Sequence, residues 1–93
     1  MDLNEAKKII LSELEPYREK SYSELISLID EIYTYEKKGP SGVGYQIEIQ
    51  LMWDGEKGGD VRAMGNIDDG GLRAFLPLTE CFIKSPSEKF IDE

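Results

Sequence analysis

The apolar residues of this chain change their spacing near residue 44. Before that point they recur every three or four residues, which is the pattern of an amphipathic helix. After it they alternate with polar residues, as in a strand that buries one face. The change of period predicts a single α+β domain over residues 1–93, with two N-terminal helices packed on one face of an antiparallel sheet of three to four strands.

The first helix is predicted to run from about Leu3 to Glu15. Asp2 and Glu5 have the spacing of a capping box just before it. Pro16 is expected to end it, because proline has no backbone N–H and crowds the preceding turn. The apolar positions of this helix are Leu3, Ala6, Ile9, Ile10 and Leu14.

A second, longer helix is predicted from Ser21 to Lys38. Ser21 and Glu24 repeat the capping-box spacing, and Gly39-Pro40 supplies a cap and a stop. Residues 38–44 are then expected to be a flexible joint to the sheet. The apolar positions that predict this helix are Tyr22, Leu25, Ile26, Ile29, Ile32 and Tyr33.

Three strands are predicted in the second half of the chain. The first covers residues 45–53 and the second about Asp60 to Ile67, joined by a turn-rich connection. A third is predicted around Leu72, Ala74 and Leu76, after the glycines of a tight loop. The last residues are expected to form a short edge strand, a turn at 85–87 and a tail anchored by apolar residues.

The alternation also predicts the strand register. If apolar residues share one face, Leu51 pairs with Ala63, Ile49 with Gly65, and Gly65 faces Ala74. The helices should then cover the face that carries Ile47, Ile49, Leu51, Val61 and Leu72. The opposite face should carry two rows, namely Glu48, Asn66 and Arg73, and Gln50, Met64 and Phe75.

Composition and charge narrow the class of protein. With 40% hydrophobic and 32% charged residues, the sequence is typical of a folded domain. Nineteen acidic against eleven basic residues give a formal charge of −8. This charge disfavours binding to nucleic acid or to an anionic membrane surface. It favours either a basic protein partner or plain solubility.

The chain has one cysteine, Cys81, so an internal disulfide is excluded and a reducing cytoplasm is the expected location. The N-terminal residues lack the pattern of a secretion signal, and no apolar run reaches the ~20 residues that span a bilayer. The protein is therefore expected to be neither exported by that route nor embedded in a membrane.

The absence of histidine excludes histidine-based nucleophile activation and zinc sites within the chain. Cys81 is interpreted as a small buried hydrophobic residue, and Asp68-Asp69 as turn residues in preference to metal ligands. The chain is accordingly predicted to have no catalytic residues, metal or cofactor, and not to be an enzyme. Trp53, Tyr45 and Tyr22 fall on the expected core face, whereas Tyr17, Tyr33 and Tyr35 are not assigned.

Four segments of the second half of the chain form a distinctive set, namely Tyr45-Gln46-Ile47-Glu48-Ile49-Gln50, Trp53-Asp54, the run from Gly65 to Phe75 (GNIDDGGLRAF) and Pro77-Leu78-Thr79. They resemble a small family of uncharacterised bacterial cytoplasmic proteins, and Ser21-Tyr22-Ser23-Glu24-Leu25 extends the likeness. The resemblance implies a stand-alone bacterial domain. It implies no activity and transfers no site residues.

Three functional hypotheses remain open. The favoured one is an acidic protein-interaction module, of which an inhibitor or immunity-type protein is one form, that binds a partner through Glu48, Met64, Arg73 and Phe75 on the outer sheet face. The second is a small-molecule or enzymatic site in a cleft between the second helix and the sheet, with Glu48, Asp68, Asp69 and Arg73 as its polar groups. The third is a homo-oligomer that uses the same apolar patch. As an alternative to any interface on this face, the tail could fold over it and bury it, through Phe82, Ile83, Phe90 and Ile91.

Overall fold

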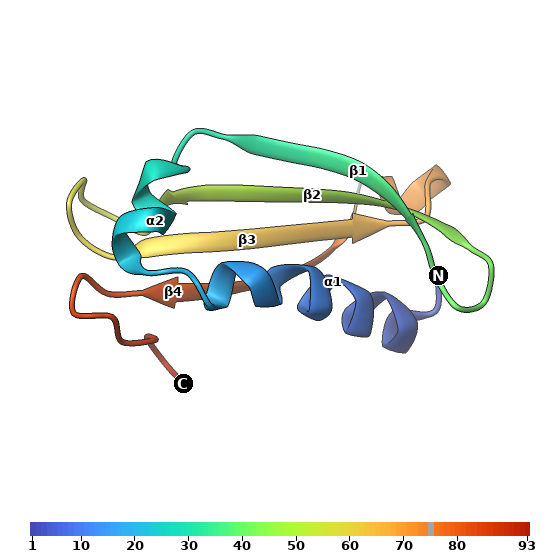
Figure 1. Cartoon of the computed structure of the whole chain (residues 1–93). Helices are drawn as coiled ribbons and strands as arrows, with labels where there is room; N and C mark the ends of the chain where they lie inside the picture. The colour runs from blue at the N-terminus through green and yellow to red at the C-terminus, as the bar shows by residue number, and fades with distance from the viewer. Residues whose placement is uncertain (75) are drawn as a thin grey trace.

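One long helix and one short helix lie on the same side of a four-stranded antiparallel sheet (Figure 1). The computed structural model describes residues 1–74 and 76–93. Its elements are α1 (Leu3–Arg18), α2 (Tyr22–Ser27), β1 (Ile32–Lys38), β2 (Gly44–Trp53), β3 (Val61–Asp68), a 3-10 helix η1 (Gly71–Ala74) and β4 (Leu78–Lys84). The strands pair in sequence order, β1-β2-β3-β4, and the predicted α+β fold class is confirmed.

Helix α1 packs mainly on β3 and β4. Its N-cap is Asp2, whose Oδ1 accepts a hydrogen bond from the backbone N–H of Glu5 at 3.1 Å. The helix continues past Pro16 to Arg18, so the predicted end at Glu15 is wrong. In the last turn a proline removes only one backbone hydrogen bond, and packing of the apolar face outweighs that cost.

The second helix is much shorter than predicted. The capping box of Ser21 and Glu24 forms as expected, but α2 ends at Ser27 and Asp30 has a φ of 75°. A left-handed residue cannot continue an α-helix. The β-branched and aromatic residues that follow instead form β1, which pairs with β2 through a hairpin at residues 39–43 in place of the expected flexible joint.

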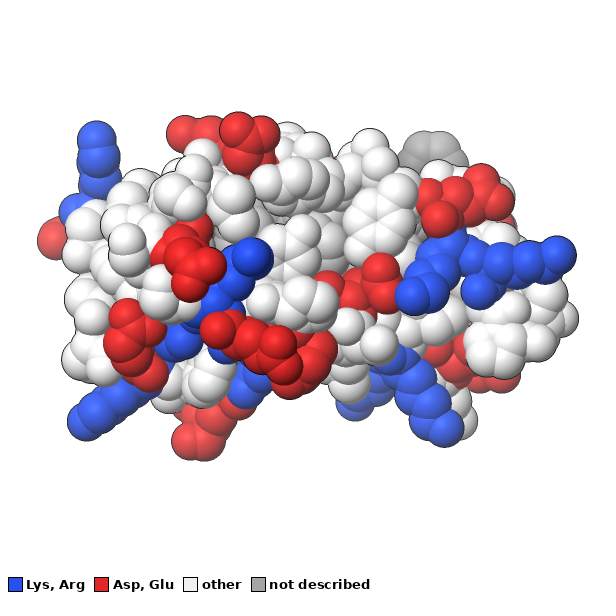
Figure 2. Space-filling view, viewed as in Figure 1, with Lys and Arg blue, Asp and Glu red and all other residues white. Residues whose placement is uncertain are grey.

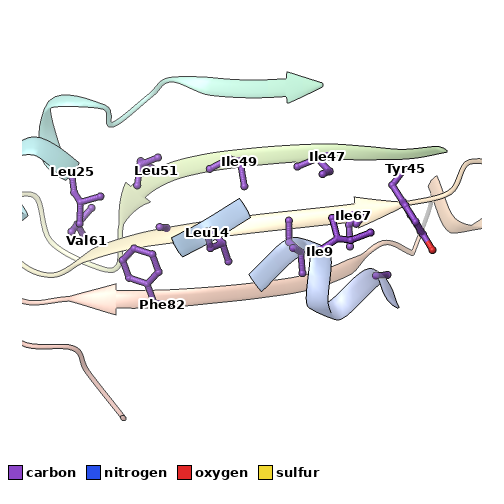
Figure 3. Close-up of a cluster of buried hydrophobic side chains, with 13 residues drawn as sticks. Ile9, Leu14, Leu25, Tyr45, Ile47, Ile49, Leu51, Val61, Ile67 and Phe82 are labelled. Atoms are coloured by element: carbon purple, nitrogen blue, oxygen red, sulfur yellow. The ribbon is translucent and has the colours of Figure 1, made fainter. Parts of the chain in front are cut away.

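The core lies between α1 and the sheet (Figure 3). Ile47, Ile49, Leu51 and Val61 are buried there, which confirms the predicted inner face for these four residues, whereas Leu72 belongs to η1 and not to the sheet. Leu51–Ala63 and Ile49–Gly65 are register pairs as expected. Tyr45 is buried as predicted, whereas Tyr22 and Trp53 are half-buried. The buried members from the sheet are Tyr45, Ile47, Ile49, Leu51, Val61, Ala63, Ile67 and Phe82, and those from the helices are Ala6, Ile9, Ile10, Leu14 and Leu25.

The third predicted strand is wrong. Gly70 and Gly71 have φ values of 87° and 58°, as expected of glycines in the predicted tight loop, but the chain then enters η1 in place of a strand. Leu76 is 74% exposed. The strand beside β3 is β4, and Gly65 therefore faces Glu80 in place of Ala74.

The tail returns along the free edge of β4. The N–H of Ile91 donates to the carbonyl of Ile83 at 2.9 Å, and the ring of Phe90 meets that of Phe82 edge-on at 5.7 Å. The guanidinium of Arg18 lies over the Phe90 ring at 4.2 Å and pairs with Glu93. These contacts hold the tail against the end of α1, so it does not cover the opposite face of the sheet.

Lys84 is a buried charged residue that ties β4 to the end of α1. Its Nζ donates to the carbonyl of Lys20 at 2.8 Å and lies 3.4 Å from a carboxylate oxygen of Glu88. A buried ammonium group requires such partners, because desolvation of an unpaired charge is costly.

None of the helices in the described residues is long and apolar enough to cross a membrane.

Candidate functional site

The sheet face opposite α1, here called the outer face, carries the residues of the predicted partner site. Alternate residues of each strand point to it, and the register places them in four rows and one terminal pair. The rows are Glu36, Gln46 and Asp68; Thr34, Glu48, Asn66 and Thr79; Ile32, Gln50, Met64 and Cys81; and Met52, Arg62 and Ile83. The terminal pair is Lys38 and Gly44, beside the first row.

The first two rows form a polar, acidic half of the outer face. Asn66 links its neighbours, because its Nδ2 donates to Glu48 at 3.4 Å and its Oδ1 accepts from the Thr79 hydroxyl at 2.6 Å. Gln46 Nε2 donates to Glu36 at 3.1 Å. This half contains a depression of about 310 Å³, lined by Thr34, Gln46, Ile47, Glu48, Asn66, Asp68 and Pro77.

The other two rows form an apolar half. Ile32 is 55% exposed, while Met52, Met64 and Ile83 are half-buried among their neighbours. Arg62 lies among them, and its Nε donates to Asp54 at 2.8 Å. This hydrogen bond raises the pKa of Arg62 above its ordinary value, and the pair leaves little net charge in the apolar half.

The structure brings two of the four predicted partner residues together. Glu48 and Met64 lie in adjacent rows of the outer face, opposite Asn66 and Gln50 as predicted. Arg73 does not extend either row, because it belongs to η1 beyond the end of β3, and Thr79 takes the position expected for it. Phe75 lies outside the described residues, and Cys81 takes its predicted place beside Met64.

Cys81 is exposed, so its interpretation as a buried residue is wrong. Its neighbour Phe82 points into the core, and in a strand the next side chain points the other way. Arg62 Nη1 lies 3.7 Å from the Cys81 sulfur.

The predicted cleft between the second helix and the sheet does not bring the expected polar set together. Glu48 and Asp68 line the depression on the outer face, whereas α2 lies on the other side. Asp68 accepts a hydrogen bond from the N–H of Gly70 at 2.8 Å, which is a turn contact. Within residues 1–74 and 76–93, no three acidic or cysteine side chains gather closely enough to hold a metal ion.

Sequence reasoning missed the contribution of β1 and β4 to this face. Thr34, Glu36 and Ile32 were assigned to a helix, although the β-branched and aromatic content of residues 32–35 is typical of a strand. In β4, Thr79, Cys81 and Ile83 alternate with inward residues, a signal weakened by the charged Glu80 and Lys84 on the inner side.

Comparison with protein-family models, curated proteins and solved structures gave no match to this chain.

Proposed function

We propose that this protein is a small acidic interaction module that binds a basic protein partner through its outer face. The observation that carries the proposal is the division of that face into an apolar half next to an acidic half. An apolar anchor with a charged border is the usual anatomy of a protein interface. An inhibitor or immunity-type protein is the form of this function that the charge favours.

The apolar half supplies the anchor. Met64 lies beside Cys81 in one row, and Met52 and Ile83 flank Arg62 in the next. Methionine adapts its shape to a partner at low cost because its side chain is unbranched and flexible. Burial of these side chains by a partner would supply most of the binding free energy, since a few central residues dominate most interfaces.

The acidic half supplies the selectivity for a basic partner. Glu36, Glu48 and Asp68 hydrogen-bond to uncharged donors, and none of them forms an ion pair with a cation among the described residues. Arginine or lysine side chains of a partner would find free carboxylate oxygens here. The formal charge of −8 would in addition speed the encounter with a positively charged protein.

Two variants test the two halves separately. Met64→Glu places a charge in the apolar half, and Glu48→Lys reverses one in the acidic half. The wild-type chain is first used to retain binding proteins from a lysate of the source cells. Each retained protein is identified and purified, and its affinity for the wild-type chain and for the two variants is measured by calorimetry. Each variant should weaken binding at least about 30-fold, the effect of a central interface residue.

Matched controls carry the same changes elsewhere. Leu11→Glu alters an exposed apolar residue of α1, and Glu56→Lys alters an exposed acid in the β2–β3 loop. Both should bind like the wild type, and all four variants should keep the wild-type circular dichroism spectrum. Wild-type affinity of Met64→Glu and Glu48→Lys for the retained partner would contradict the proposal.

The outer-face depression favours a second candidate function, small-molecule binding. Its volume of about 310 Å³ lies at the lower end of ligand sites, and its lining is mostly polar. A rise in melting temperature with a small cationic metabolite, abolished by Glu48→Gln, would support this alternative.

The third hypothesis, a homo-oligomer, is tested by sedimentation of the wild-type chain and of Met64→Glu. An oligomer that uses the apolar half would become monomeric in Met64→Glu.

A further inference from the structure

The inner face of the sheet is only half covered by helix. Strands lie about 4.8 Å apart and helices about 10 Å apart, so a four-stranded sheet has room for two helices side by side. Helix α1 covers β3 and β4 and reaches only the margin of β2, while the six residues of α2 lie at one end (Figure 1). The inner side of β1 therefore has no helix above it among the described elements.

A groove runs along this uncovered strip, between α1 and β1, and is here called the α1–β1 groove. It consists of two adjoining cavities of about 450 and 440 Å³ that share Ser12 and Glu13. The first cavity is lined by aromatic and aliphatic side chains, including Tyr17, Leu28, Tyr33 and Tyr35. Figure 2 shows uncharged residues in the middle of this side of the molecule, with both acidic and basic side chains among and around them.

Glu13 holds the two walls of the groove together. Its carboxylate accepts hydrogen bonds from the Tyr35 hydroxyl at 2.8 Å and from Lys37 Nζ at 2.7 Å, which joins α1 to β1 between the two cavities. Tyr35 nevertheless remains 38% exposed. The bridge thus leaves a cavity on each side of it and an aromatic surface open to solvent.

The border of the groove is positively charged, in contrast to the chain as a whole. Lys20 lines the first cavity, and Lys8, Lys37 and Lys38 line the second. Glu13 is the one acid among the residues that line them, and Lys37 already neutralises it. A chain of formal charge −8 thus presents an apolar groove bordered by lysines, which is complementary to an acidic ligand.

The spacing of the cavities fits a helical ligand. The residues of α1 that line them are centred near residue 14 or 15 in the first cavity and near residue 10 or 11 in the second, and a rise of 1.5 Å per residue places the two centres about 6 Å apart along the helix. Two side chains at positions i and i+4 of a helix have this separation. A helix here would also fill the uncovered strip.

We infer that the α1–β1 groove binds an amphipathic helix of a partner protein, with apolar side chains at i and i+4 and acidic residues beside them. A second copy of this chain fits less well. Its exposed α1 residues Leu3 and Leu11 are eight positions apart, and Lys7 and Lys8 accompany them and would meet the lysines of the groove. The groove lies on the opposite side of the sheet from the outer face. The proposed groove and the proposed outer-face interface can therefore be tested independently of each other.

Three synthetic helices of about 15 residues test the inference. They share leucines at i and i+4 and differ only in the flanking residues, which are glutamate, glutamine or lysine. Binding is measured by fluorescence anisotropy of labelled peptides and located by amide chemical shifts of the protein. The glutamate peptide should bind about tenfold or more tightly than the lysine peptide, lose affinity with added salt, and shift residues of α1 and β1 around the groove.

Paired charge reversals provide the internal control. Lys8→Glu with Lys20→Glu should weaken the glutamate peptide by about tenfold or more. Lys57→Glu with Lys89→Glu makes the same change of charge at exposed sites away from the groove and should leave binding unchanged.

Several results would overturn the inference. One is the absence of shifts around the groove at about 1 mM glutamate peptide, a concentration that would reveal even weak binding. Equal affinity for the lysine peptide, or equal loss in both paired variants, would also contradict it. Saturation of the same shifts by free glutamate would indicate a small-molecule site. A wild-type dimer that Lys8→Glu and Lys20→Glu alter would indicate a second copy as occupant.

Discussion

The Cδ1 atom of Ile10 lies 2.8 Å from the position that a β-carbon would occupy at Gly65, and its Cγ1 atom lies 2.9 Å away. The side chain of Ile10 therefore packs directly on the backbone of β3. Ile49 closes the site from the neighbouring strand, with its Cδ1 atom 3.2 Å from the same position. Glycine in a strand interior is usually unfavourable, but here it allows the close approach of α1 to the sheet.

Gly65→Ala should consequently destabilise the protein by about 1 to 3 kcal/mol, the range for overpacking a close-packed core. Ile10 is fully buried and cannot move its side chain into solvent. Urea unfolding of the variant measures the loss. The double variant Gly65→Ala with Ile10→Ala should lose less than the sum of the two single changes, and strict additivity would show that the two sites do not compete for space.

Ile49→Ala should cost about 2 to 5 kcal/mol, because Ile49 is fully buried at the centre of the core and its truncation leaves a cavity. Gln50→Ala, on the outer face one residue away, should change the free energy of unfolding by less than about 0.5 kcal/mol. Chemical denaturation of both variants gives the comparison. Equal losses would mean that the two faces of β2 do not differ in burial.

The central strands could be predicted from the sequence because each has one buried face. In β2 and β3 every inward position described is apolar or glycine, so both the alternation and the register between Leu51 and Ala63 were correct. The helix cap at Asp2 and the capping box at Ser21 were also recognisable, since they depend on local contacts. In each of these features, the local sequence pattern is enough to indicate which residues are buried or which residue caps the helix.

The edge strands β1 and β4 do not show such a pattern. In β1 even the inward residue Lys37 is exposed, so no buried alternation marks the strand. In β4 the inward positions include Glu80 and Lys84, which find partners only in the tertiary structure: Lys7 at 3.9 Å and the carbonyl of Lys20. The position of either strand, and hence the full outer face and the α1–β1 groove, depends on contacts between distant segments.

Cys81 should react with a thiol reagent in the folded protein. It is exposed on β4, beside the outer-face residue Met64. Absorbance during reaction with an aromatic disulfide should show one equivalent of thiol without denaturant. Cys81→Ser should abolish the reaction and alter stability by less than about 0.5 kcal/mol. Reaction that requires denaturant would show that the thiol is buried.

Calcium should not alter the melting temperature. Asp68 already accepts a hydrogen bond from the N–H of Gly70, and Asp69 is the next residue of the same turn-type sequence. Thermal melting is compared in low-millimolar calcium, in chelator, and with or without reductant. A reproducible rise with calcium that Asp68→Asn removes would establish a cation site, because a ligand that binds only the folded state must stabilise it.

The bridge made by Glu13 should give a pH-dependent contribution to stability. Burial acts to raise the pKa of Glu13, but the hydrogen bonds from Lys37 and Tyr35 outweigh it, so the pKa lies below the ordinary value of 4.5. For a carboxyl group with a lowered pKa in the folded state, the stabilisation is fully present above the unfolded-state pKa and is lost as the pH falls through the folded-state pKa.

Glu13→Gln should therefore lower the free energy of unfolding by about 1 kcal/mol at neutral pH, the usual contribution of a charge-assisted hydrogen bond at a partly exposed site. The difference between wild type and variant should shrink as the pH falls below the unfolded-state pKa of glutamate, about 4.3, and through the lower pKa of Glu13 in the folded state. Urea unfolding at a series of pH values measures it, with Glu56→Gln in the exposed β2–β3 loop as a control for net charge. A difference that stays constant from neutral to acid pH would mean that Glu13 contributes through packing alone, and that the charge of its carboxylate does not hold α1 against β1.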